Sequence, residues 1–437
     1  MKSKQAENIR GVIRYVQQFK NALIVIYIDE KTIDSSLFSS HINDIALLHK
    51  AGLQVIIIPG ARNRIDEILT TSKIKWTYKN NVRITSSEAM PLIKMAAFDV
   101  SNTVMTSLAA NGITAVIGNW VRSRAKGIID GFDYGTAGEI DKLEVSSIKT
   151  VLSDGFIPIF PCIGWNSIGR PYNISTVSLA QQIAINLQAD KLFFYVSSPT
   201  LNSSLYNIPQ NFPLTKNGNI PAMDLTQVDL FLKENPSSTG TIPALLSSAK
   251  EACQNGVTRV HIVDGNVDGV ILSEIFSDLG SGTMIYTSDY GTIRSMQQND
   301  IPSVISIQKP FVDSGKLLPR TENQIEESIN DYIVYELDGG IRACASLHVY
   351  QDNQAEIAAV AVDDSFAHMG IGPKMISFLI NKAHQNKINN IFILTTQASD
   401  WFEKLGFELD NLNSLPQERL ALWSQDRNSK VYRLRKN

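Results

Sequence analysis

The chain has 437 residues, 43% of them hydrophobic and 19% charged, with a formal net charge of −3. A single hydrophobic core rarely extends beyond about 250 residues, so this length predicts two or three folding units. The nearly neutral charge gives no electrostatic reason to expect nucleic acid or an anionic membrane as a partner, and no apolar run reaches the ~18 residues that span a bilayer.

The N-terminus, MKSKQAENIR, lacks the apolar core of a signal peptide, so we expect a cytoplasmic protein. An amphipathic helix is predicted at 9–19, and it either joins the core or contacts another subunit. The three cysteines are far apart and show no CxxC spacing, which predicts buried, reduced thiols and no metal site.

From about residue 20 to 290, apolar strands alternate with amphipathic helices. This order predicts an α/β unit with a parallel sheet that is covered on both faces. Strands are predicted at 22–28, 53–58, 114–117, 156–160, 192–196 and 257–263, with helices near 41–50, 175–187 and 243–254.

The stretch 199–215 is rich in Pro, Asn and Ser and predicts an irregular surface excursion, and 287–312 predicts a linker. Domains are therefore expected at 1–290 and 291–437. In the second, a helix at 322–330 precedes three consecutive strands, which predicts an α+β domain. Its strands are expected at 332–337, 341–349, 356–362, 390–395 and 430–433, with helices at 373–385 and 399–404.

In this second domain, an apolar strand leads into a turn that reaches Gly370-Ile371-Gly372, and a helix is expected from Pro373. Glycines let the backbone approach a ligand closely, and the N–H groups of a helix start bind anions. This arrangement predicts a cradle for the pyrophosphate of an acyl-CoA. Glu356 stands at the other end of the same strand.

The order strand–AHMGIG–helix, followed by WFEKLGF at 401–407, resembles the GNAT acetyltransferase superfamily. The first domain is similar to amino-acid kinases. Its motifs are DIALLH (44–49), GAR (60–62), DGFDY (130–134), GE (138–139), ADKL (189–192), DG (268–269), SEIF (273–276) and GTM (282–284). With LLPRT (317–321), LTT (394–396) and RNSK (427–430), the chain resembles the bacterial N-acetylglutamate synthase family over nearly its whole length.

The resemblance implies an amino-acid-kinase-like parallel-sheet sandwich fused to an α+β GNAT domain. It also implies transfer of the acetyl group of acetyl-CoA to the α-amine of L-glutamate, the first step of arginine biosynthesis, in ring-like hexamers. The first domain would bind arginine as a feedback regulator, and the second would carry the chemistry.

Specific roles follow from the resemblance. Glu356 would be the general base and Thr395 an acid or a hydrogen-bond donor to the thiolate. The substrate carboxylates would meet Arg320, Arg427, Ser429 and Leu318. Acetyl-CoA would contact the backbone of Val360 and Val362 and the loop of His368, Met369, Gly370, Ile371 and Gly372.

For arginine, the resemblance points to Glu274, Asp278, Gly280, Ser281, Gly282 and Thr283. An acidic pair beside a glycine turn can meet a guanidinium and an α-ammonium, while loop N–H groups meet the carboxylate. An ordinary capped helix end explains the same residues equally well.

The chain departs from these families at several positions. Carboxylates at Asp29 and Glu30 stand where the kinases place a lysine and glycines for ATP phosphates, which argues against ATP binding. Ala367 replaces a frequent Gln or Arg, and Lys374 either compensates for it or is only solvated. Phe402 replaces a frequent tyrosine, which excludes a tyrosine acid at that position.

Three functions remain open at this level. The first is an acetyl-CoA:L-glutamate N-acetyltransferase. The second is an arginine-binding sensor whose transferase site has drifted out of use, and the third, disfavoured by the missing lysine and glycines, is an amino-acid kinase. Glu356 could also be a carboxylate that merely ends a strand, and His348 belongs either to the strand surface or to the rim of a substrate site.

Overall fold

The computed structural model describes residue 13 and residues 20–434, apart from 80–81, 198, 200, 210–211, 213, 216–217, 237–240, 277–281, 288–290 and 338–339. The side chains of Ser365, His368 and Met369 also lie outside the description. The chain divides into two compact units, Met1–Ser288 and Asp289–Asn437.

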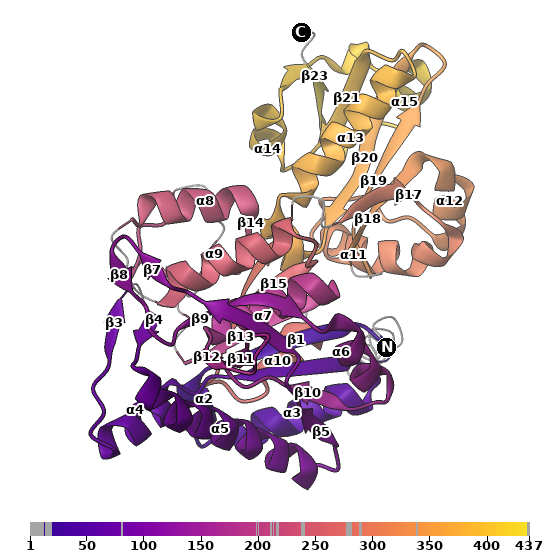
Figure 1. The fold of residues 1–437 in the computed structure, drawn as a ribbon. Helices are drawn as coiled ribbons and strands as arrows, with labels where there is room; N and C mark the ends of the chain where they lie inside the picture. Colours follow the sequence, from indigo (N-terminus) through magenta and orange to yellow (C-terminus); the bar gives the residue numbers. More distant parts are fainter. Residues whose placement is uncertain are drawn as a thin grey trace. The chain divides into compact units, whose positions relative to one another are not determined.

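An eight-stranded sheet forms the centre of the first unit, in the order β14-β16-β15-β13-β1-β2-β10-β5 (Figure 1). Every neighbouring pair runs parallel except β15 and β16. The strands are β1 (Leu23–Ile28), β2 (Gln54–Pro59), β5 (Ala115–Ile117), β10 (Ile157–Ile159), β13 (Lys191–Val196), β14 (Ala222–Asp224), β15 (Arg259–Asp264) and β16 (Thr283–Tyr286).

Helices cover both faces of this sheet, as predicted. Side chains alternate along a strand, so Val25 and Tyr27 of β1 join one core cluster while Ile24 and Ile26 join another. The first cluster includes α7 and α9, and the second includes α3, α5 and α10. The helices are α2 (Glu30–Ile33), α3 (Phe38–Lys50), α4 (Arg62–Thr71), α5 (Met90–Ala110), α6 (Val145–Ser153), α7 (Thr176–Leu187), α8 (Leu225–Glu234), α9 (Thr241–Gln254) and α10 (Val270–Phe276).

A four-stranded sheet and two hairpins in the same unit escaped prediction. Their strands are short and expose many polar side chains, so the apolar pattern of a buried strand is missing. The sheet contains β6 (Val121–Ala125), β9 (Gly138–Leu143), β11 (Ile163–Trp165) and β12 (Pro171–Asn173); the hairpins are β3 (Thr77–Lys79) with β4 (Val82–Ile84) and β7 (Ile128–Ile129) with β8 (Phe132–Asp133).

The second unit is a seven-stranded sheet in the order β17-β18-β19-β20-β21-β23-β22, in which only β20 and β21 run parallel. Its strands are β17 (Thr292–Ser295), β18 (Tyr332–Leu337), β19 (Gly340–Val349), β20 (Gln354–Val362), β21 (Asn390–Thr395), β22 (Phe407–Asp410) and β23 (Lys430–Leu434). Its helices are α11 (Ile301–Asp313), α12 (Glu322–Glu327), α13 (Ile371–Gln385), α14 (Ser399–Lys404) and α15 (Gln417–Ala421). Its short 3₁₀ turns are η2 (Gln298–Asp300), η3 (Ile329–Asp331), η4 (Asp364–Met369) and η5 (Leu412–Ser414), while η1 (Ser87–Ala89) belongs to the first unit.

The predicted linker at 287–312 is wrong over most of its length, because β17 and α11 occupy it. The helix α11 begins with a proline in its first turn, where proline is tolerated, and buries Ile301, Val304 and Ile307. A second proline, Pro310, lies inside the helix and disguised the pattern. None of the helices in the described part of the chain combines the length and apolar character needed to cross a membrane.

Candidate functional site

The strand β20 offers an open backbone edge. It pairs with β19 as far as Val362, but its ladder with β21 ends at the pair Glu356↔Phe392. In the pairing that the structure describes, the β21-facing backbone groups beyond Glu356 therefore have no strand partner. An extended ligand can add to such an edge. The predicted backbone contacts at Val360 and Val362 lie in this open stretch.

A bulge bends β20 within the same stretch. The register moves from Cys344↔Ala361 to Ser346↔Ala358, so β20 contains one extra residue, and Ala359 has a φ of 53°. That left-handed conformation costs a non-glycine residue roughly 1–2 kcal/mol. Strain of this kind is concentrated at functional sites, where it redirects backbone groups out of a ladder.

The two glycines of the predicted cradle have different tasks. Gly370, with a φ of 64°, caps α13, and a Cβ there would meet nothing within 4 Å, so the helix start is open. A Cβ on Gly372 would lie 3.0 Å from the Trp401 ring, so this glycine serves packing. The prediction that the helix begins at Pro373 is wrong by two residues, because Gly370 takes the cap position and α13 begins at Ile371.

The rest of the cradle is partly described. The backbone of His368 and Met369 belongs to η4, while their side chains lie outside the described part. Ala367 and Lys374 are exposed. The prediction overlooked Arg342, whose guanidinium lies 4.5 Å from the Phe366 ring centre and so brings a positive charge beside this loop.

Glu356 is buried and held by two donors. The Tyr350 hydroxyl donates to Oε2 over 2.8 Å, and Arg419 donates through Nε to Oε2 (2.6 Å) and through Nη2 to Oε1 (3.2 Å). The side chain of Glu356 is only 6% exposed, so it is not an edge carboxylate that merely ends a strand. Sequence reasoning overlooked both partners. No spacing signal could have found Arg419, which is distant in the chain.

The protonation states of these partners suit their roles as donors. Burial, followed by the charge of Glu356, raises the pKa of Tyr350 well above its ordinary value, so the hydroxyl keeps its proton. Burial alone would lower the pKa of Arg419, but the hydrogen bonds and charge of Glu356 raise it. Both groups therefore remain protonated and can donate hydrogen bonds to Glu356.

Two further arginines lie near Arg419. In the described part of the chain, the buried Nη1 of Arg320 has no hydrogen-bond partner, and Nη2 of Arg427 donates to the Lys316 carbonyl over 2.8 Å. Burial and the charges of Arg320 and Arg419 lower the pKa of Arg427. Because Arg419 is paired with Glu356, the charges of Arg320 and Arg427 favour an anionic ligand, especially one with carboxylates that accept bidentate hydrogen bonds.

The remaining predicted substrate contacts flank these groups. Thr395 ends β21, its hydroxyl accepts a hydrogen bond from the Ala398 N–H over 3.0 Å, and it pairs with Lys430, next to Ser429. The Ser429 carbonyl accepts from the indole N–H of Trp423 over 3.2 Å. Leu318 is exposed.

The structure also places Phe402 and His348, two side chains whose roles the sequence left open. Phe402 is buried, with its ring 4.7 Å from that of Trp401, and contributes packing. His348 lies directly opposite Glu356 in the β19–β20 ladder, and its ring nitrogens contact Asp331 (2.6 Å) and the Ser346 hydroxyl (3.1 Å).

In the first unit, the end of β1 carries two acidic residues, Asp29 and Glu30, and the first of them binds nearby backbone N–H groups. The Asp29 carboxylate accepts hydrogen bonds from the backbone N–H groups of Thr32 (2.7 Å) and Ser197 (2.9 Å). Burial raises the pKa of Glu30, and Nε of Arg62 lies 4.0 Å from its carboxylate. The N–H groups that could hold a phosphate are thus occupied by the chain's own carboxylate.

The predicted arginine segment contains a buried polar cluster. Glu274 contacts Nδ1 of His261 over 2.8 Å and accepts from the Gly282 N–H over 3.0 Å. Burial lowers the pKa of His261 to about 4, and burial also holds the pKa of nearby Lys191 well below its ordinary value. His261 and Lys191 were overlooked, because their meeting depends on the register of β13 and β15.

Other predicted members of this segment are less informative. Thr283 is buried, and its hydroxyl donates to the Ile220 carbonyl over 2.6 Å. Asp278, Gly280 and Ser281 lie outside the described residues, as does most of the predicted N-terminal helix at 9–19. Within the described residues, no group of three or more His, Cys, Asp or Glu side chains could hold a metal ion.

Comparison with known proteins extends this description. The Amino acid kinase family matches residues 24–264, and the Acetyltransferase (GNAT) domain matches residues 328–409. The amino-acid acetyltransferase of Actinobacillus pleuropneumoniae serotype 7 (strain AP76) is 30% identical over 423 residues, which cover 95% of each chain. That of Escherichia coli (strain K12) is 28% identical over 441 residues, or 98% of each chain.

Solved structures of a related enzyme are also similar to this chain over nearly its whole length. N-acetylglutamate synthase from Neisseria gonorrhoeae in complex with coenzyme A and L-arginine is 26% identical, with a TM-score of 0.78 and 99% of each chain covered. The same enzyme in complex with coenzyme A and N-acetyl-glutamate gives a TM-score of 0.62 with 100% of each chain covered.

Proposed function

Because the chain belongs to the amino-acid acetyltransferase family, whose members are acyltransferases, we propose that it acetylates the α-amine of L-glutamate with acetyl-CoA, giving N-acetyl-L-glutamate and CoA. This reaction would open arginine biosynthesis. The observation that carries the proposal is the buried Nη1 of Arg320, which has no partner among the described residues, in a unit where the charges of Arg320 and Arg419 both act on Arg427. Glutamate carries two carboxylates, and these would relieve the repulsion among the arginines.

Glu356 is proposed as the general base, acting through a water molecule. The substrate ammonium must lose a proton before its nitrogen can attack, and a carboxylate is a suitable acceptor. Among the described contacts, Oε2 accepts two hydrogen bonds, from Arg419 and Tyr350, whereas Oε1 accepts one, from Arg419. Oε1 is therefore the oxygen that can accept a hydrogen bond from water.

Thr395 is proposed to donate a hydrogen bond from its hydroxyl to the departing thiolate. The Ala398 N–H already occupies a lone pair of the hydroxyl oxygen, which leaves the O–H to point elsewhere. Arg320 and Arg427 are proposed to bind the substrate carboxylates, with Ser429 and the backbone at Leu318 completing the pocket. Their half-buried guanidinium groups support this role, since desolvated arginines bind carboxylates strongly.

Acetyl-CoA supplies the thioester as acetyl donor. The open edge at Val360 and Val362 suits the pantetheine arm, and the backbone N–H groups from His368 through Gly372 suit the pyrophosphate. Arg342 and Lys374 add positive charge where Ala367 adds none. Coenzyme A in the solved synthase of Neisseria gonorrhoeae supports acetyl-CoA as the donor.

The proposal includes feedback regulation by L-arginine at Glu274 and its neighbours, together with a cytoplasmic location and a hexameric assembly. The buried carboxylate of Glu274 offers a counter-ion for a guanidinium. Backbone N–H groups of the same segment, which contains Asp278, Gly280, Ser281, Gly282 and Thr283, would meet the ligand carboxylate. The arginine complex of the Neisseria gonorrhoeae enzyme supports this part.

A thiol-release assay with a panel of amino acids tests the proposed function. With acetyl-CoA present, CoA should appear rapidly with L-glutamate and far more slowly with L-glutamine, because an amide cannot accept the bidentate arginine contacts of a carboxylate. Release at equal rates with both amino acids would refute the assignment of glutamate. Arginine binding without any transferase activity would favour a sensor instead.

A further inference from the structure

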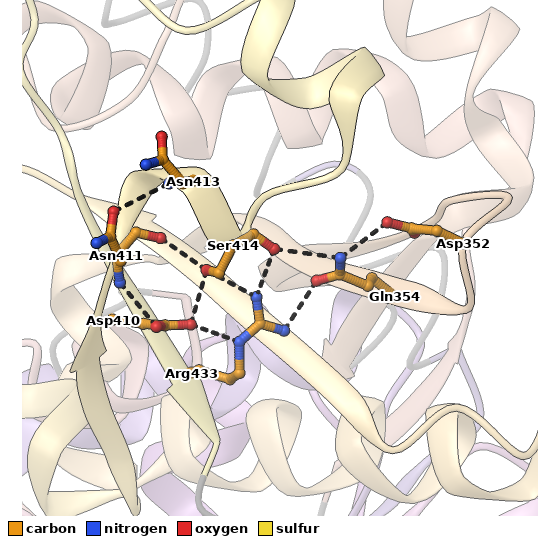
Figure 2. Close-up of polar contacts among 7 residues, drawn as sticks. All are labelled: Asp352, Gln354, Asp410, Asn411, Asn413, Ser414 and Arg433. Atoms are coloured by element: carbon orange, nitrogen blue, oxygen red, sulfur yellow. Dashed lines mark hydrogen bonds and ion pairs between the residues drawn. The ribbon is translucent and has the colours of Figure 1, made fainter.

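A second cluster of polar side chains lies near the start of β20, and Arg433 of β23 is its centre (Figure 2). Arg433 donates to the Asp410 carboxylate (2.6 Å), to the Gln354 side-chain oxygen (2.8 Å) and to both the carbonyl and the hydroxyl of Ser414 (3.0 Å each). The Gln354 amide also donates to the Ser414 carbonyl over 3.2 Å and to Asp352 over 2.8 Å.

These contacts fix the segment 410–416 to the central sheet. Partial burial would raise the pKa of Asp410, but the hydrogen bonds from Arg433 and Ser414 lower it, so the carboxylate stays charged. Leu415 is buried in a cluster with Phe392 and Val431, which adds an apolar anchor. The segment is therefore held at Asp410 by its ion pair with Arg433 and at Leu415 by apolar packing.

The segment leads directly into α15, which carries Arg419. Arg419 reaches back to Glu356, two residues beyond Gln354 on β20. Residues two apart in a strand share a face. Arg433 therefore binds Gln354, and Arg419 binds Glu356, on the same face of β20. A shift of the segment at Ser414 would move Arg419 and with it the Glu356 carboxylate.

We propose that Arg433 is a positioning residue of the transferase site, which acts through Ser414 and α15 to hold Arg419 on Glu356. The proposal rests on the assignment of Glu356 as the general base. Arginine suits this task because its planar fork can bind three groups at once, whereas a lysine ammonium cannot reproduce that geometry. Loss of alignment of a catalytic group by about 1 Å can reduce turnover by as much as ~100-fold.

The kinetic test compares Arg433→Gln, Arg433→Lys and Arg419→Gln with the control Arg294→Gln. Arg294 binds Asp300 and Glu336 at the opposite edge of the same sheet, so its loss removes comparable ion pairs away from α15. Arg433→Gln should reduce kcat about tenfold and leave KM for acetyl-CoA within about twofold. Arg433→Lys should retain thermal stability through Asp410 yet lose most of the same kcat, while Arg294→Gln changes stability alone.

A double-mutant cycle tests whether Arg433 affects kcat through Arg419. If Arg433 acts through Arg419, adding Arg433→Gln to Arg419→Gln should cost less than about twofold in kcat. Independent, multiplying losses would overturn the proposal, as would full kcat in Arg433→Lys.

A substrate-free measurement separates this proposal from the proposed function. In protein with ¹⁵N-labelled arginine, the Nε–H of Arg419, assigned through Arg419→Gln, should exchange with solvent slowly in the wild type because Glu356 accepts its hydrogen bond. Exchange should become about tenfold faster in Arg433→Gln and stay unchanged in Arg294→Gln. Unchanged exchange in Arg433→Gln would overturn the positioning role even if no amino acid proved to be a substrate.

Discussion

In the second unit, burial and the charges of Arg320 and Arg419 lower the pKa of Arg427, and a buried guanidinium nitrogen of Arg320 has no partner among the described residues. In the first unit, the carboxylate of Asp29 takes the N–H groups at the end of β1 for itself. Both are polar sites near the end of a sheet. The difference between them matches the proposed roles: the proposed glutamate site retains charge for a ligand, whereas the N–H groups at the end of β1 are already bound by Asp29.

The largest expected effect is that of Glu356→Gln. Removal of a general base typically costs about 10²–10⁴ in rate, so kcat should fall by roughly that factor, with little change in KM for acetyl-CoA. Thiol release measures both quantities. The exposed Glu403, on α14, provides the control, and Glu403→Gln should retain wild-type kcat. A kcat for Glu356→Gln within twofold of wild type would remove Glu356 from the mechanism.

Arg320→Ala and Arg427→Ala should act on substrate binding. Each loses a charge-assisted contact of roughly 1.5–3 kcal/mol, so KM for glutamate should rise about 10- to 100-fold. KM for acetyl-CoA should stay constant, which initial-rate measurements with either substrate varied can establish. An equal rise in both constants, or none, would contradict the idea that these charges are reserved for glutamate.

A smaller effect is expected at Thr395. Thr395→Val keeps the shape but removes the hydroxyl, and kcat should fall about tenfold through loss of one hydrogen bond to a developing charge. Thr395→Ser keeps the hydroxyl and should recover most of the activity. If valine and serine behave alike, the hydroxyl has no part in thiolate departure.

The first unit should affect regulation without affecting basal turnover. Glu274→Gln should abolish the response of kcat to added L-arginine, while the rate without arginine stays within about twofold of wild type. Binding of arginine by calorimetry should weaken in the same variant, because a buried carboxylate is lost from the site. An unchanged arginine titration would remove Glu274 from the proposed regulatory site.

The last expected effect concerns stability rather than activity, and it depends on pH. The pKa of His261 is lowered to about 4 in the folded chain, below its ordinary value, so the unfolded chain binds the proton more readily. The contribution of His261 to stability should therefore be fully present above about pH 6.5 and decline as the pH falls toward 4. The free energy of unfolding, measured with denaturant at several pH values in this range, should change less steeply with pH in His261→Gln than in the wild type. A slope equal to that of wild type would show that His261 is not responsible.

The sequence predicted most of the fold but only part of the site. Continuous apolar strands such as 22–28 mark a buried parallel sheet, and strand, glycine loop and helix around Gly370 mark the acetyltransferase order. The edge strand β17 and the helix α11 were missed because one is mostly polar and the other contains two prolines. Contacts were less predictable than elements: Arg419 lies 63 residues from Glu356, and nothing in their spacing shows that they meet.

The central claim is that the second unit transfers an acetyl group to glutamate with Glu356 as base. Mass spectrometry of the products formed from acetyl-CoA and L-glutamate tests it most directly. The wild type should release one CoA for each N-acetyl-L-glutamate, and Glu356→Gln should form both products at a small fraction of that rate. CoA released without N-acetyl-L-glutamate, or equal rates in the two proteins, would contradict the account.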